Sequence, residues 1–163
     1  MGLLDGVIET KPGWIGKMEV VEVTYDPTLT SLDKLVKQAE SCKCALKVFT
    51  RSDAQQKLAQ QVIGERAVRS DASIRVDDDK YYTSRTPLAH LPMTPLQATL
   101  VNERIGAKKD PSDLLAPSQL ALLSRLKKEP ERAWPKAIGV GFRAAWAAAE
   151  EHGALPLPKK PLR

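Results

Sequence analysis

Cysteine and histidine are scarce in this sequence, and their scarcity limits the chemistry that the chain can carry. Its 163 residues include two cysteines, Cys42 and Cys44, and two histidines, His90 and His152. Four such side chains are sufficient in number for one zinc ion, but they lack the paired spacing of a zinc motif. A glycine-rich phosphate loop and internal repeats are absent as well. The sequence therefore predicts no metal site and no bound cofactor.

Long apolar runs and a concentration of positive charge are also missing. No segment approaches the roughly 20 apolar residues that cross a bilayer, because Arg143 interrupts the best candidate, residues 137–149. The amino terminus lacks the basic and apolar regions of a secretory signal, so we expect a cytoplasmic protein without a membrane span. The net charge of +5 is spread along the chain. Nucleic-acid binders usually gather positive charge on one face, so we expect no nucleic-acid partner.

A β-hairpin is the best-defined element that the sequence does contain. Residues 20–25 alternate with the period of two that marks a strand with one packed face. Residues 7–10 form a shorter β-branched run, and the proline and glycines of residues 12–16 supply the turn. Further strands are predicted at residues 45–50 and 72–76.

Five helices are predicted from capping residues and from apolar positions at helical spacing. Capping boxes at Thr30 with Asp33 and at Ser52 with Gln55 begin the first two. The others are predicted after Thr94, from Ser118 with Leu122, Leu123 and Leu126 inward, and near residues 138–152. Together these elements indicate an α+β fold, with a mainly antiparallel sheet and helices packed on one face.

The composition changes after residue 128, which suggests a division of the chain there. We expect an α+β domain over residues 1–128 and a C-terminal extension over residues 129–163. The extension holds an alanine-rich helix with Trp146 on its apolar stripe, followed by a proline- and lysine-rich end. Such a stripe is usually part of a core, and the alternative is a surface that binds a partner or a membrane.

Residues 4–27 carry a resemblance to a known family. They contain, in order, Leu-Asp-Gly-Val, a Gly-aromatic-x-Gly turn, and Glu-Val-Val-Glu-Val-Thr-Tyr-Asp-Pro. This order resembles the amino-terminal third of the A-type peptide methionine sulfoxide reductases, over about twenty positions. The resemblance implies a ferredoxin-like α+β fold, reduction of oxidised methionine in peptides or proteins, and a thioredoxin-like reductant. It also implies that Gly13 and Trp14 bind substrate, with Trp14 in place of the usual tyrosine.

The catalytic cysteine of that family does not carry over. In the family it lies in a Gly-Cys-Phe-Trp-Gly run upstream of the Leu-Asp-Gly-Val segment, and this sequence begins at Met1 without that run. The remaining thiols are Cys42 and Cys44, and Lys43 and Lys47 beside them would help to hold a thiolate. We therefore predict Cys44 as nucleophile and Cys42 as its resolving partner. The alternative is that Cys44 points into the core and Cys42 is an ordinary loop thiol.

Two functional hypotheses follow. The first is a thiol-dependent methionine sulfoxide reductase that uses Cys44 and Cys42, or a cysteine encoded upstream of Met1. The second is a non-catalytic relative on the same fold that binds a peptide or protein through Trp14 or the aromatic tail helix.

Overall fold

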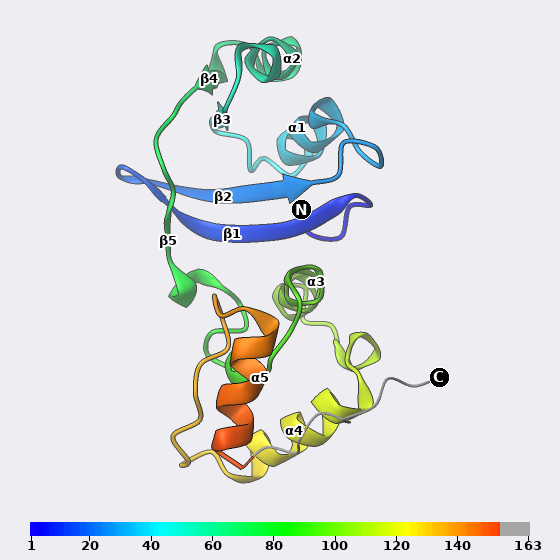
Figure 1. The fold of residues 1–163 in the computed structure, drawn as a ribbon. Helices are drawn as coiled ribbons and strands as arrows, with labels where there is room; N and C mark the ends of the chain where they lie inside the picture. Colours follow the sequence, from blue (N-terminus) through cyan, green and yellow to red (C-terminus); the bar gives the residue numbers. More distant parts are fainter. Residues whose placement is uncertain (154–163) are drawn as a thin grey trace. The chain divides into compact units, whose positions relative to one another are not determined.

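The computed structural model describes residues 1–153, which form five strands and five α-helices (Figure 1). The chain divides into two compact units, residues 1–76 and residues 77–163. The first unit contains all five strands with α1 and α2, and the second contains α3, α4 and α5. The α+β class predicted from the sequence is confirmed. No helix among the described residues is both long and apolar enough to cross a membrane.

The predicted hairpin is present, with its turn in a different place. Strands β1 (Val7–Ile15) and β2 (Met18–Tyr25) pair antiparallel, and Ile15 lies opposite Met18. The two-residue turn is therefore Gly16-Lys17, and the φ of Gly16 is 60°, a conformation that glycine adopts without strain. The prediction that Pro12 and Gly13 lie in the turn was wrong, because β1 continues through both residues.

A third strand completes this antiparallel sheet. Strand β5 (Arg75–Val76) pairs with Gly13 and Trp14, which gives the strand order β2-β1-β5. The strand predicted at residues 72–76 is confirmed only for its last two residues. In β2, the predicted packed face is not formed at Val21, whose side chain is 54% exposed. The alternation of apolar and polar residues in β2 therefore predicted the strand correctly, but it did not predict which of its residues are buried.

The second pair of strands is parallel. Strands β3 (Val48–Thr50) and β4 (Ala67–Arg69) are joined by helix α2 (Asp53–Ile63). Because α2 carries the chain back to the end of the sheet where β3 begins, β4 runs in the same direction as β3. The prediction of one mainly antiparallel sheet was therefore wrong in detail, since a separate two-stranded parallel sheet accompanies the antiparallel one. The strand predicted at residues 45–50 keeps only its last three residues, and the short strand β4 was not predicted.

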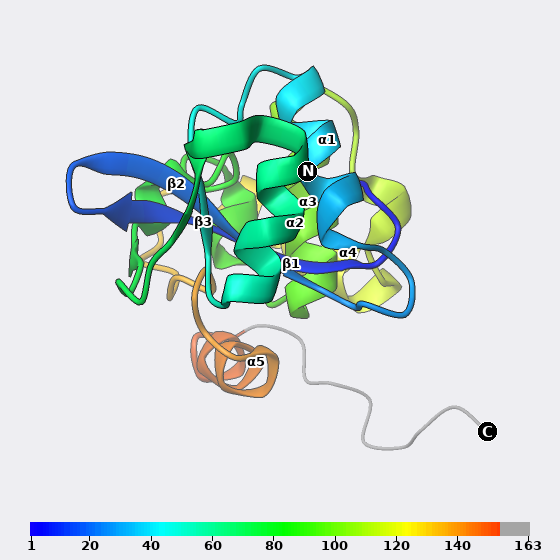
Figure 2. The ribbon, with the colours of Figure 1, turned by 90° about the horizontal axis from the view of Figure 1, so that it is seen from above.

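Helices α1 (Leu32–Ser41) and α2 lie side by side, on the same side of the hairpin (Figures 1 and 2). The cap predicted at Ser52 is confirmed, because its hydroxyl accepts a hydrogen bond from the Gln55 N–H at 3.2 Å. In the first helix the N-cap position is Ser31, one residue after the predicted Thr30, and its side chain makes no capping hydrogen bond. The core of this unit is a small buried cluster of Val36, Ala59, Ile63 and Ala67.

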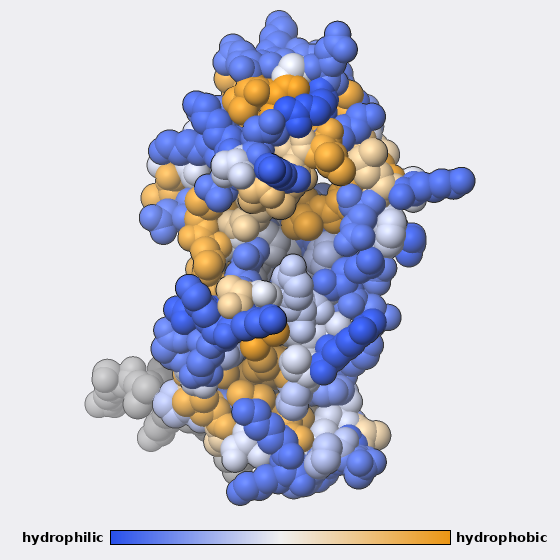
Figure 3. Space-filling view, turned by 180° about the vertical axis from the view of Figure 1, so that it is seen from behind, coloured by the Kyte–Doolittle hydropathy of each residue, from blue (hydrophilic) through white to orange (hydrophobic). Residues whose placement is uncertain are grey.

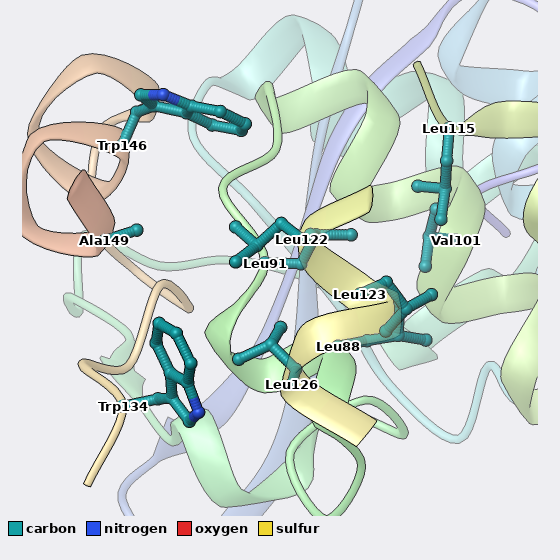
Figure 4. Close-up of a cluster of buried hydrophobic side chains, with 10 residues drawn as sticks. All are labelled: Leu88, Leu91, Val101, Leu115, Leu122, Leu123, Leu126, Trp134, Trp146 and Ala149. Carbon is teal, nitrogen blue, oxygen red and sulfur yellow. The ribbon is translucent and has the colours of Figure 1, made fainter. Parts of the chain in front are cut away.

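The second unit packs three helices around one larger core. These are α3 (Pro95–Gly106), α4 (Pro117–Lys128) and α5 (Phe142–Glu151). Figure 4 shows their apolar side chains converging with those of the preceding and connecting segments. The buried cluster consists of Leu88, Leu91, Val101, Leu115, Leu122, Leu123, Leu126, Trp134, Trp146 and Ala149. The predicted burial of the three α4 leucines is confirmed, as is the interpretation of the tail helix as part of a core.

The compact units differ from the predicted division after residue 128. Trp134 and Trp146 come from the predicted extension, yet they share one buried cluster with Leu122 and Leu126 of α4. The structure divides the chain between Val76 and Asp77 instead. The predicted proline- and lysine-rich end, residues 154–163, lies outside the described residues.

Exposed large apolar side chains occur in both compact units. On the face shown in Figure 3, hydrophilic side chains cover most of the surface, with apolar side chains in smaller patches between them. Among the exposed large apolar side chains of residues 1–153, Leu46 has the highest exposed fraction, 83%. It lies two residues after Cys44, in the segment that connects α1 to β3.

Candidate functional site

The candidate site is the segment Cys42–Lys47, which we call the dithiol loop. It begins where α1 ends, and its first backbone N–H groups satisfy the last carbonyls of that helix. Cys42 N–H donates to Gln38 O at 3.2 Å, and Cys44 N–H donates to Ala39 O at 2.8 Å. Between them, Lys43 has a left-handed φ of 57°, which is uncommon for a residue other than glycine. This reversal of the chain presents the two cysteines together.

Both cysteine side chains are exposed, and their sulfur atoms are in contact. The distance between Cys42 Sγ and Cys44 Sγ is 2.7 Å. The Cys42 thiol also lies 3.3 Å from the Ala39 carbonyl oxygen, and the Cys44 thiol lies 3.3 Å from the carbonyl oxygen of Cys42. The alternative in which Cys44 points into the core was therefore wrong. Two thiols so placed can exchange with an external disulfide or form one with each other.

The dithiol loop is held to the ends of α1 and α2 by Arg66, a residue that the sequence analysis did not identify. Arg66 donates from Nη2 and Nη1 to the two carboxylate oxygens of Glu40, at 2.8 and 2.9 Å. Arg66 Nη1 also donates to the carbonyl oxygen of Ala45 at 2.8 Å, and Nε donates to that of Ile63 at 3.3 Å. One guanidinium therefore joins the end of α1, the dithiol loop and the end of α2.

The dithiol loop carries positive charge that neighbouring carboxylates do not neutralise. The hydrogen bonds from Arg66 hold the pKa of the Glu40 carboxyl below its ordinary value of 4.5. The charge of Glu40 is thus matched by Arg66. Lys43 and Lys47 are exposed and make no ion pair with any residue of the described chain. Their ammonium groups are the cations next to the sulfur atoms that remain available to an approaching anion.

The predicted substrate-binding residues Gly13 and Trp14 lie in a strand pairing. Gly13 is buried in β1 opposite Val20 and Val76, and Trp14 is half-buried opposite Glu19 and Arg75. A Cβ atom at Gly13 would overlap the Arg75 carbonyl oxygen and lie 2.9 Å from Ile74 Cγ1. Glycine is therefore required at this position because β5 packs closely against β1. The structure brings Cys42 and Cys44 together, and it gives Gly13 a packing role.

The histidines, which were the remaining candidate metal ligands, make local hydrogen bonds. Nδ1 of His90 lies 3.1 Å from the Pro135 carbonyl oxygen, and Nδ1 of His152 lies 2.9 Å from that of Ala148. Within residues 1–153, no three histidine, cysteine, aspartate or glutamate side chains are grouped so that they could hold a metal ion.

A groove in the second unit lies against α3, α4 and α5. Its volume is about 400 Å³, and it is lined by Leu96, Leu100, Phe142 and the amides of Gln97 and Gln119. Gln119 is buried, and its side chain bonds with Gln97, the Pro92 carbonyl and the Ala116 N–H at 2.7 to 2.9 Å. Because these amide groups are already partnered, the groove offers apolar walls and no group that demands a ligand.

Comparison with known proteins adds no assignment, since no family model, no curated protein and no solved structure matches this chain. The dithiol loop is accordingly the candidate site on the strength of its own geometry.

Proposed function

We propose that this protein is a thiol oxidoreductase in which Cys44 and Cys42 cycle between a dithiol and a disulfide. The observation that carries this proposal is the contact of two exposed sulfur atoms, 2.7 Å apart, at the surface of one loop. Structural cysteines are usually buried and inert, whereas exchange requires accessible sulfur atoms. A nearby second thiol also protects an oxidised cysteine by condensing with it.

For the oxidising substrate we propose the S epimer of methionine sulfoxide in peptides or proteins. The support is the resemblance of residues 4–27 to the A-type reductases, and in this proposal the α+β unit of residues 1–76 is a shortened form of their fold. The nucleophile would then have moved to the dithiol loop. Trp14 is half-buried and would offer part of its ring to the methyl group of the substrate.

The chemistry requires two steps that consume two thiols and release water. The Cys44 thiolate attacks the sulfoxide sulfur, the oxygen is protonated and transferred, and methionine leaves while Cys44 becomes a sulfenic acid. The Cys42 thiol then attacks the Cys44 sulfur, the hydroxyl leaves as water, and a disulfide forms. An external dithiol returns the pair to the reduced state by exchange.

The alternative function is binding of a peptide without turnover. It loses one of its two proposed surfaces, because Trp146 of the tail helix is 1% exposed and belongs to the core of the second unit. Trp14 is the aromatic group that remains for such binding.

The deciding experiment is dithiothreitol-driven reduction of a peptide that contains the S epimer of methionine sulfoxide. We expect turnover by the unmodified chain and complete loss in Cys44→Ser. Without dithiothreitol, Cys42→Ser should form one equivalent of methionine and stop at the sulfenic acid, which added dithiothreitol can then reduce directly. The R epimer serves as the control substrate. Absence of turnover in the unmodified chain would reject the reductase and leave the binding function.

A further inference from the structure

We propose that two copies of this protein pair along the outer edge of β2, so that their three-stranded sheets join into one continuous sheet. In the described part of the chain, β2 is the terminal strand of the order β2-β1-β5, and its outer edge has no strand partner. An unpaired edge offers a row of backbone N–H and C=O groups to another chain. This pairing does not depend on the proposed thiol chemistry, which uses the dithiol loop.

The register of the hairpin identifies the backbone groups that face this edge. Pro12 lies opposite Val21 and has no N–H group, so these two residues cannot form a hydrogen-bonded pair. Hydrogen-bonded and non-hydrogen-bonded pairs alternate in an antiparallel ladder, so the outward groups belong to Val21 and, two residues away on each side, to Glu19 and Val23. Among residues 1–153, no backbone hydrogen bond outside the pairing with β1 reaches Val21 or Val23. Their N–H and C=O groups are the ones that a partner strand would use.

The other side of the hairpin is protected against such pairing. Strand β5 covers β1 at only two residues. Elsewhere β1 has Pro12, an ion pair of Lys11 with Glu9 at 2.8 Å, and a register irregularity between Val7 and Glu9. Proline, lysine and irregular register are devices that keep edge strands from pairing. Residues 18–25 of β2 contain no proline, lysine or glycine, so this edge lacks that protection.

The β2 edge is also accessible. The side chains of Met18 and Val21 are 40% and 54% exposed, and Glu19 and Thr24 are exposed as well. Figures 1 and 2 both show the turn end of the hairpin extending beyond α1 and α2. Pairing at this edge would therefore bury apolar side chains in addition to satisfying backbone groups.

The sequence of β2 favours a second copy as the partner, because the strand can pair with itself without opposing like charges. In a two-fold antiparallel arrangement centred on Val21, each Val21 faces its counterpart, and Glu19 faces Val23 of the other copy. All three residues direct their backbone groups outward, so these pairs can exchange hydrogen bonds. Glu22 faces Val20, so both carboxylates of the strand lie opposite valines. The surface is thus complementary to itself, as a two-fold interface requires.

Other registers that match the outward groups are less favourable. Centring the pair on Glu22 places two carboxylates directly opposite each other, which is destabilising. Centring it on Val20 or Val23 shortens the ladder, because β2 has only 8 residues. The register centred on Val21 is therefore the longest one without opposed like charges.

The test is the oligomeric state of the full-length chain, measured by sedimentation equilibrium over a range of concentrations. Dithiothreitol is present, so that no dimer forms through a disulfide. The edge variants are Val21→Lys and Val21→Glu, each of which places like charges opposite each other in the proposed register. The matched control is Val76→Lys, which makes the same change at a 42% exposed valine of β5.

We expect a reversible dimer in the parent and in Val76→Lys, and a dissociation constant at least about tenfold higher for each edge variant alone. An equimolar mixture of Val21→Lys and Val21→Glu should recover the dimer, because the two introduced charges are opposite. Recovery also shows that both variants are folded, and it should weaken in high salt. In the parent, protection of the Val21 and Val23 amides from hydrogen exchange should rise with protein concentration.

A parent that stays monomeric at about 1 mM would overturn the proposal, because even weak self-association is populated at that concentration. A dimer that persists unchanged in Val21→Lys would overturn it as well, as would an equal loss in Val76→Lys, since either result places the contact elsewhere. A mixture that stays monomeric would reject the register centred on Val21. In a monomeric parent, protection of the Val21 amide by an added peptide of alternating threonine and valine would assign the edge to a peptide instead.

Discussion

Arg66 shows how much of the candidate site depends on a single side chain. Its planar guanidinium presents several N–H groups in a fixed fork, which matches the two oxygens of the Glu40 carboxylate and leaves a donor for the Ala45 carbonyl. A lysine in its place would offer one ammonium group without this geometry. The choice of arginine therefore ties the chain before and after the two cysteines to one point.

The Glu40 and Arg66 pair makes a pH-dependent contribution to stability. The pKa of Glu40 is lowered in the folded protein, so the contribution is complete above the ordinary value of 4.5 and is lost as pH falls through the lowered value. We expect Glu40→Gln to lower the urea midpoint near pH 7, and the difference from the parent to narrow steadily below pH 4.5. Urea unfolding, monitored by circular dichroism between pH 3 and pH 7, measures the midpoints of the variant and the parent and the difference between them.

Glu65→Gln is the matched control, since Glu65 is exposed one residue before Arg66 and forms no ion pair within the described chain. Its effect on the midpoint should be small at every pH. A difference between Glu40→Gln and the parent that stays constant down to pH 3 would contradict the proposed linkage.

At the scale of elements, a pair of glutamines joins α3 to α4. The Thr94 hydroxyl caps α3, and Gln97, which could have completed that cap, instead donates to Leu114 O and to Gln119 at 2.7 Å. Gln119 in turn accepts from the Ala116 N–H at the start of α4. The start of α4 is thus joined to the first turn of α3 through the buried Gln119 side chain and the half-buried Gln97 side chain.

Replacing Gln119 by leucine keeps the approximate volume and removes these bonds. The buried Pro92 carbonyl and the part-buried Ala116 N–H would lose their partner, and we expect a loss of about 1–3 kcal/mol in the free energy of unfolding. Gln61→Leu changes an exposed residue of α2 and should stay within about 0.5 kcal/mol of the parent. Chemical denaturation of the parent, Gln119→Leu and Gln61→Leu measures these free energies. Equal losses in the two variants would refute the stabilising role of the Gln119 hydrogen bonds.

At the scale of the whole molecule, each compact unit has its own core. The buried cluster of the first unit has four members, two of them alanines, whereas that of the second has ten, including Trp134 and Trp146. Because buried aromatic rings contribute a large apolar area, the second unit depends strongly on its C-terminal helix. This explains why a boundary drawn from composition alone separated parts that fold together.

Trp146→Ala tests this dependence. The ring is 1% exposed in the cluster of Figure 4, and its removal leaves a cavity among α4 and α5 side chains. We expect a loss of about 3–5 kcal/mol in stability, measured by urea unfolding. Val140→Ala, at a position that is 41% exposed, should change stability by less than about 0.5 kcal/mol. Stability of Trp146→Ala close to that of the parent would show that the second unit does not depend on α5.

Part of the candidate site follows from the sequence. The cysteine pair and its lysines could be identified from the sequence, because all four lie within six residues of one another. The contact of the two sulfur atoms could not, since it accompanies the left-handed backbone at Lys43. The exposure of Leu46 and the bonds from Arg66 could not, since Arg66 and Glu40 are 26 residues apart. A signal for Arg66 would require knowing that the ends of α1 and α2 meet.

The sequence by itself determined the local elements: the strands of the hairpin, the caps at Ser52 and Thr94, and the leucine face of α4. Each depends on residues within about one or two turns of one another, so a short pattern contains the information. Only the tertiary structure decided the turn at Gly16, the close packing of β5 on Gly13, the parallel pairing of β3 with β4, and the boundary at residue 76. These features depend on contacts between distant segments, whose free energy balances chain entropy against burial over a whole unit and leaves no periodic signal in the chain.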